Sequence, residues 1–144
     1  MKRIATALLV ILAVGAAVYF LTRNPPQQPS PRPLEDRSFI INGRPTTCGE
    51  LIRQPCGFGL QTEYNRFGDR LENFVNSSDL GPFATDIGFA ATAKLSLQAC
   101  RLSHTVGKTI LEFVELGRLD HSDAGSPQLF PFWNRARESL CPGG

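Results

Sequence analysis

An uncharged apolar run near the N-terminus most constrains what this chain can become. It comprises the 18 residues 4–21 (IATALLVILAVGAAVYFL) and follows Lys2 and Arg3. As a helix the run would extend about 27 Å, close to the roughly 30 Å hydrocarbon core of a bilayer. Positive charges stay on the cytoplasmic side, so residues 1–3 are expected in the cytoplasm and the rest of the chain outside it. The sequence therefore predicts a single-pass anchor in the cell membrane, with an extracytoplasmic or periplasmic C-terminal part.

A cleaved signal peptide is the alternative for this run. Small residues at 13–15 (AVG) or 15–17 (GAA) offer weak cleavage sites, but the apolar run continues past both. Cleavage there would leave an apolar new N-terminus, which favours the uncleaved anchor. Both interpretations export residues 22–144.

A proline-rich stretch follows the apolar run. Residues 22–33 (TRNPPQQPSPRP) contain five prolines in twelve residues. This composition cannot bury a core and favours an extended spacer of roughly 35 Å. We expect a linker over residues 22–37 and a folded domain over residues 38–144.

Within that domain, apolar residues recur every three or four positions, which is the period of an amphipathic helix. The cleanest such stripe consists of Tyr64, Phe67, Leu71, Phe74 and Val75. Four helices are expected, over residues 61–78, 85–104, 109–116 and 131–140. Gly107 and Gly117 are expected to end the second and third. The predicted fold class is all-α, a small disulfide-stapled helical bundle preceded by one N-terminal transmembrane helix.

Two short segments precede these helices. The Asn42–Gly43 pair suits a tight turn, but Pro45 would interrupt a second strand. We therefore expect an extended segment and a turn there rather than a sheet. Thr47 and Glu50 form a capping-box pattern, so a helix of at most two turns is expected before Pro55.

The cysteine count points to disulfide bonds. All four cysteines lie beyond the apolar run, at Cys48, Cys56, Cys100 and Cys141. An even number in a small exported domain indicates a disulfide framework, for which three pairings are possible. We favour Cys48–Cys56 and Cys100–Cys141. The first pair requires an early helix end and a chain reversal near Pro55, because eight helical steps would separate the α-carbons by about 12 Å.

Cys100 and His104 raise the question of a catalytic pair, because residues four apart share a helix face. A thiol beside an imidazole could act as a nucleophile with its base, or as half of a metal site. We expect Cys100 to be half of a disulfide instead. His104 is then a helix-end residue whose charge interacts with the helix dipole.

A loop near residue 120 offers a second alternative for metal binding, from Asp120, His121 and Asp123. A solvated surface loop is the simpler interpretation. The chain has only two histidines and no Cys-x-x-Cys pair, so zinc spacing is missing. No metal, cofactor or catalytic residue is therefore predicted.

A dense apolar cluster, LFPFW at residues 129–133, is the candidate contact surface. It consists of Leu129, Phe130, Phe132 and Trp133 around Pro131. Most aromatic residues of a small bundle belong to its core, but part of so dense a cluster could remain exposed. An exposed aromatic patch would mark a protein or lipid contact.

Two segments carry a resemblance to a known family. GFAATAKLSLQACRL at residues 88–102 and FWNRARESLCP at residues 132–142 resemble a family of small exported domains from mycobacteria and related actinobacteria, whose members have no assigned function. The matching positions are Gly88, Phe89, Cys100, Cys141 and Pro142. The resemblance covers roughly residues 63–142 and implies a helical domain with a Cys100–Cys141 bridge. The chain departs from that pattern in Cys48, Cys56, the proline-rich linker and the anchor.

These observations favour a binding or accessory role over catalysis. The net charge is +2 and the basic residues are scattered, which argues against nucleic-acid binding. We expect a membrane-anchored accessory protein of a cell-envelope complex, with a membrane-protein partner. A carrier or sensor of a lipid or small apolar ligand is the alternative. An enzyme using His104, His121 or a free Cys100 is more remote.

Overall fold

The computed structural model describes residues 34–77 and 79–143. The predicted anchor at residues 4–21 lies outside these residues, as does the linker up to residue 33. Within the described part, no helix is long and apolar enough to cross a membrane. The compact unit begins at Leu34, four residues before the predicted domain start. Its first residues lie against a helix, since the Asn65 side-chain amide donates to the Glu35 carbonyl at 2.6 Å.

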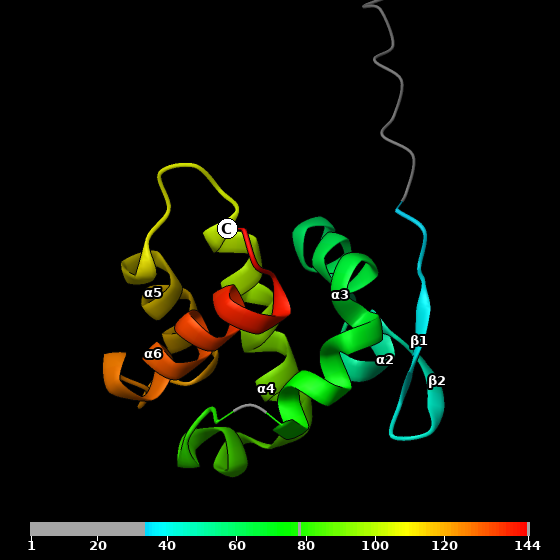
Figure 1. Cartoon of the computed structure of the whole chain (residues 1–144), viewed down its shortest axis with the longest axis horizontal. Helices are drawn as coiled ribbons and strands as arrows, with labels where there is room; N and C mark the ends of the chain where they lie inside the picture. Colours follow the sequence, from blue (N-terminus) through cyan, green and yellow to red (C-terminus); the bar gives the residue numbers. More distant parts are fainter. Residues whose placement is uncertain (1–33, 78, 144) are drawn as a thin grey trace, which may run out of the picture. The chain divides into compact units, whose positions relative to one another are not determined.

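The domain is mainly helical, as the sequence predicted. Its elements are β1 (Ser38–Ile41), β2 (Arg44–Thr47), α2 (Cys48–Ile52), α3 (Phe58–Ser77), α4 (Pro82–Ser103), α5 (Ile110–Asp120), α6 (Ser126–Arg135) and a π-helical turn, η1 (Ala136–Leu140). Helix α4 runs through the middle of the bundle, with α3 on one side and α5 and α6 on the other (Figure 1). The hairpin and α2 lie at the outer side of α3, and α2 also contacts α4.

The expectation that residues 38–47 form no sheet is wrong. β1 and β2 make a two-stranded antiparallel hairpin in which Ile40 lies opposite Pro45. Asn42 and Gly43 form its two-residue turn with φ of 50° and 74°. In such a hairpin the pair next to the turn is hydrogen-bonded and the following pair is not. Pro45 falls in that following pair, so its missing N–H breaks no ladder bond.

The capping box that opens α2 is confirmed. Thr47 caps the helix, and its N–H donates to the Glu50 carboxylate at 2.7 Å. The helix ends after Ile52 because Arg53 takes a left-handed conformation, with φ of 60°. This early end reverses the chain before Pro55, as the first disulfide requires.

Helix α4 differs from the predicted 85–104 helix at its beginning. It begins at Pro82 and contains a break at Gly88, where φ is 77° and ψ is 171°. A hydrogen bond from the Thr92 hydroxyl to the Ala84 carbonyl, at 2.9 Å, spans the break. The stretch after the break has one apolar face, on which Ala93, Leu97 and Cys100 are fully buried.

The end of α5 differs from the predicted one. Gly117 does not end this helix, which continues to Asp120. The glycine is there for packing, since a Cβ at this position would lie 2.8 Å from Leu129 Cδ1. Part of the predicted surface loop after Gly117 is therefore helical.

The last helix begins earlier than predicted. α6 starts at Ser126, so Pro131 lies inside it rather than in its first turn. Its apolar residues Trp133, Ala136 and Leu140 are buried, and the last two belong to η1.

Candidate functional site

The four cysteines form the two disulfides that we favoured. Cys48 pairs with Cys56 and Cys100 with Cys141, with Cα–Cα distances of 6.1 and 5.8 Å. No free cysteine occurs in the described residues, which include all four. In this disulfide-bonded state Cys100 has no thiol, so Cys100 and His104 cannot act as a nucleophile and its base.

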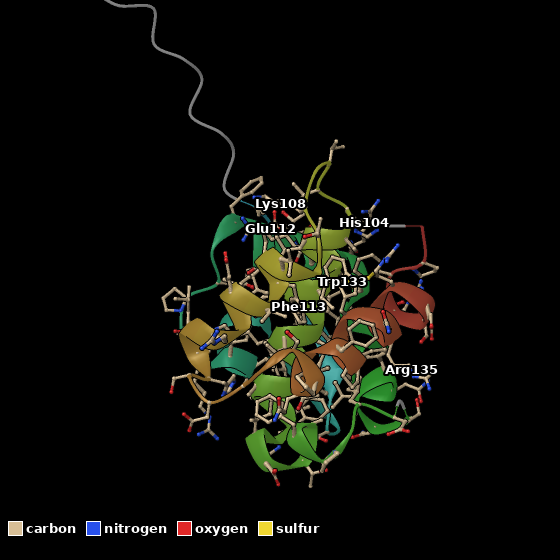
Figure 2. All side chains as sticks on the ribbon, turned by 90° about the vertical axis from the view of Figure 1, so that its left-hand side faces the viewer. His104, Lys108, Glu112, Phe113, Trp133 and Arg135 are labelled. Carbon is tan, nitrogen blue, oxygen red and sulfur yellow. A yellow bond between two sulfur atoms is a disulfide. The ribbon has the colours of Figure 1, made fainter. Side chains whose placement is uncertain are left out.

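Most of the LFPFW cluster is buried, and part of it remains exposed. Leu129, Phe132 and Trp133 belong to the core, and only Phe130 is half exposed, at 50%. The reason is the early start of α6. Spacings of three and four place Leu129, Phe132 and Trp133 on the same helix face, which packs inward. Figure 2 shows Trp133 beside Phe113, whose ring lies 5.7 Å away between centroids.

His104 lies at the end of α4, where it contacts other side chains instead of being fully solvated. Its Nδ1 atom is 3.9 Å from Glu63 Oε2, and its ring stacks on Phe67 at a centroid distance of 6.1 Å. Both of these polar atoms are buried without a hydrogen-bond partner. Burial raises the pKa of the Glu63 carboxyl, against the opposing effect of the charges on His104, Arg66 and Arg101.

Glu63 and His104 form an ion pair only when His104 is protonated. The described residues place no free thiol beside it. The hydroxyls of Ser103 and Thr105, the nearest in sequence, donate to the carbonyls of Cys100 and Arg101. The contact between Glu63 and His104 brings α3 against the end of α4.

The alternative metal site near residue 120 is not assembled. Asp120 forms an ion pair with Lys94 of α4 at 2.8 Å, and the His121 ring packs edge-on against Phe83 at 5.7 Å. Among residues 34–77 and 79–143, no three histidine, cysteine or carboxylate side chains gather to hold a metal ion.

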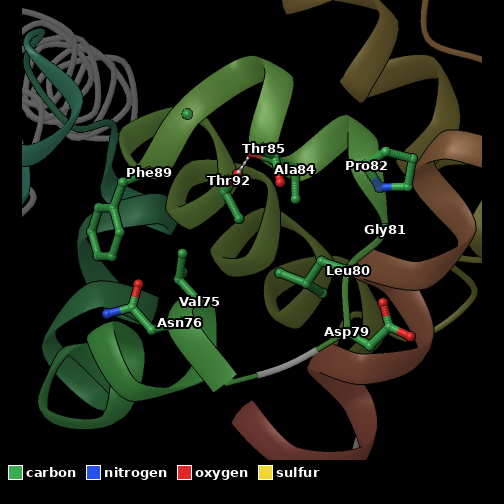
Figure 3. A pocket seen from close by; sticks show the side chains of 11 residues that line it. Val75, Asn76, Asp79, Leu80, Gly81, Pro82, Ala84, Thr85, Phe89 and Thr92 are labelled. Carbon is green, nitrogen blue, oxygen red and sulfur yellow. Dashed lines mark hydrogen bonds between the residues drawn. The ribbon is translucent and has the colours of Figure 1, made fainter.

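Two clefts of the domain are lined by the break in α4. One cleft of about 580 Å³ lies between the end of α3 and the start of α4, and Figure 3 shows Val75, Leu80 and Phe89 around it. A second cleft, of about 730 Å³, lies between α4, the hairpin and α2. Gly88 and Phe89 line both clefts.

A third cleft, of about 480 Å³, contains Phe130, the exposed member of the predicted cluster. It shares Asp79 and Gly81 with the first cleft. The three clefts are therefore adjacent, and we call the surface that they form the kink surface. Phe89 and Phe130 are its two partly exposed phenylalanines.

Sequence reasoning missed most of the kink surface. It expected a continuous helix over residues 85–104 and did not predict a break at Gly88. The available signal was the glycine itself, because an isolated glycine in a helical pattern is tolerated at a cost and often has a packing or functional reason.

Comparison with protein-family models, with curated proteins and with solved structures finds no match to this chain.

Proposed function

We propose that this protein is a membrane-anchored, non-enzymatic binding protein that serves as an accessory component of a cell-envelope membrane complex. Its folded domain lies outside the cytoplasm and contacts a membrane-protein partner through the kink surface. Any kinship with the exported mycobacterial-type domains is part of this proposal.

The proposal that this domain binds a partner rests on the adjacency of the three clefts. They meet at Gly88 and Phe89 on one side and at Asp79 and Gly81 on the other. Such an elongated surface suits an extended protein segment better than a compact small molecule. Aromatic residues, phenylalanine included, are enriched at protein interfaces, and two partly exposed phenylalanines lie on this surface.

The apolar run and the disulfides support the location. Residues 4–21 have the length and composition of a transmembrane helix. Disulfides persist in oxidising compartments outside the cytoplasm, and this domain has two. Tethering to the membrane would raise the effective concentration of the domain near a membrane partner, so a weak contact would suffice.

Site-specific photo-cross-linking in intact cells of the host tests the binding surface. A photoreactive phenylalanine would replace Phe89 or Phe130, and Leu111 would be the matched control. Leu111 is 69% exposed and lines none of the three clefts. We expect the same discrete adduct from positions 89 and 130 and none from position 111. No adduct at 89 and 130, or equal labelling at all three positions, contradicts the proposed surface.

The anchor has its own test. The intact mass of the protein, extracted from host membranes without reductant, should include residues 1–21 and two disulfides. A mass that begins after residue 15 or 17 would show a cleaved signal peptide instead.

A further inference from the structure

The second cleft of the kink surface contains charges that the fold does not use. Arg44, at the hairpin turn, and Arg53, at the end of α2, both line it. Within the described residues, neither side chain has a hydrogen-bond or ion-pair partner. Two arginines without partners in one cleft are a ready binding site for an anionic group, since guanidinium matches carboxylate in planar geometry.

One acidic residue also lines this cleft, but it forms no ion pair with either arginine. Glu50 also lines the cleft, but its carboxylate accepts hydrogen bonds from the Thr47 N–H at 2.7 Å and hydroxyl at 3.0 Å. This capping box lowers the pKa of Glu50 and holds the carboxylate at the beginning of α2. The cleft therefore keeps an excess of positive charge.

Apolar side chains adjoin these arginines. Ile41 and Leu51 are buried on the hairpin and α2 side of the cleft, and Ile87 and Phe89 come from α4. A ligand that satisfies both parts of the cleft needs a negative group next to an apolar one.

The backbone conformation of Arg53 is a second observation that points to a binding site in this cleft. Its φ of 60° is unusual for a residue other than glycine, and such outliers often mark functional sites. The turn is needed to close the first disulfide, but that need does not require an arginine. An arginine here adds a cation to the rim of the cleft.

We infer that this cleft binds an acidic–apolar segment of the partner protein, in which an aspartate or glutamate lies beside an aromatic or aliphatic side chain. The carboxylate would lie between Arg44 and Arg53, and the apolar side chain would contact Phe89. The inference rests on the proposed function. The excess positive charge selects an acidic segment, and the open cleft favours a side chain over a long acyl chain that needs enclosure.

A binding experiment on the full chain in a non-ionic detergent tests the chemistry of the cleft. The probe is 3-phenylpropionate, which joins a carboxylate to an aromatic ring, and 3-phenylpropanamide is its neutral counterpart. Arginine side-chain NMR signals would be followed, with Arg44→Lys and Arg53→Lys assigning the two signals. We expect saturable shifts of both signals with the carboxylate and about tenfold weaker binding of the amide.

Matched variants decide whether that binding is specific. Arg44→Gln with Arg53→Gln should abolish it, whereas Arg118→Gln on α5 should leave it unchanged. Arg118 also lacks a partner among the described residues and lines none of the three clefts. Equal binding of the amide, equal shifts of Arg118, or equally tight binding of inorganic phosphate would overturn the inference.

The cross-link at position 89 separates this inference from the proposed function. Arg44→Glu with Arg53→Glu should remove the adduct, while Arg118→Glu keeps it. An adduct that persists in the Arg44/Arg53 double variant overturns the acidic segment but leaves the kink surface standing. No adduct in the parent protein overturns the proposed function itself. Retained disulfides and an unchanged unfolding midpoint would show that the double variant is folded.

Discussion

Gly117 shows how closely α5 and α6 approach each other. The helix continues through this glycine, and the Leu129 side chain occupies the space in which a Cβ would lie. Helix ends are often marked by glycine, but a buried glycine in contact with another helix is needed for its small size.

Replacing Gly117 with alanine is therefore expected to destabilise the domain. Overpacking should outweigh the better helix propensity of alanine and lower the free energy of unfolding by about 1–2 kcal/mol. Urea unfolding followed by the fluorescence of Trp133, the one tryptophan of the chain, measures this. Gly57→Ala is the control, because nothing lies within 4 Å of its added Cβ. Equal stability of the two variants would contradict the close packing.

The Glu63–His104 pair predicts a pH effect. The pKa of Glu63 is raised in the folded domain, chiefly by burial, so folding is favoured when this carboxyl is protonated. Its stabilising effect is present below the unfolded pKa of about 4.3 and is lost as the pH rises through the folded pKa.

We therefore expect the stability of the parent protein to improve relative to Glu63→Gln as the pH falls from 7 to 4. The difference in free energy of unfolding between the two, measured at each pH, isolates this carboxyl from the others. Glu50 and Glu112 have lowered pKa values and act in the opposite direction, but they are present in both proteins. A difference that stays constant with pH would show that burial of Glu63 does not matter.

At the scale of elements, α4 is the one whose irregularity creates a surface. Gly88 combines a φ of 77° with a ψ of 171°, a conformation that is almost restricted to glycine. The break allows the first turns of α4 to diverge from the long second part, and Gly88 lines both the 580 Å³ and the 730 Å³ cleft.

Gly88→Ala is expected to lower the free energy of unfolding by about 1–3 kcal/mol, because alanine strains this backbone. It should also weaken the cross-link at position 89, since relief of the strain would straighten α4. Gly49→Ala serves as the control, as its added Cβ would lie 3.7 Å from the nearest atom, at ordinary contact distance. Full stability together with an undiminished cross-link would exclude a structural role for the break.

At the scale of the whole molecule, the two disulfides stabilise different parts of the chain. Cys48–Cys56 closes a local turn, with a sequence separation of 8. Cys100–Cys141 joins the end of α4 to the residue after η1, with a separation of 41, and encloses α5 and α6. Loop-closure entropy therefore favours the second bridge as the more stabilising one.

Removing each bridge by paired cysteine-to-alanine substitutions should reveal this order. The chain-entropy model predicts a loss of about 4 kcal/mol without Cys100–Cys141 and about 2.6 kcal/mol without Cys48–Cys56. Urea unfolding with Trp133 fluorescence again provides the measurement. A larger loss from the local bridge would mean that native packing, not loop entropy, controls the stability.

The sequence by itself determined the helical class and the capping box at Thr47. These depend on local spacing and chemistry, such as a threonine three residues before a glutamate, which the chain shows directly. For the disulfides the sequence favoured one of three possible pairings, and the structure forms that one. The apolar faces of α3 and α6 were also readable, because a helical period places their members together.

The tertiary structure alone decided where the clefts lie and which aromatics remain exposed. Gly117 packs against Leu129 and Gly88 breaks α4, yet both are glycines in similar helical patterns. Pro45 is tolerated because it lies opposite Ile40 in a pair of the hairpin that forms no backbone hydrogen bonds. Likewise, Phe130 remains exposed while Phe132 is buried. Each outcome depends on contacts between residues distant in the chain, and local periodicity carries no information on such contacts.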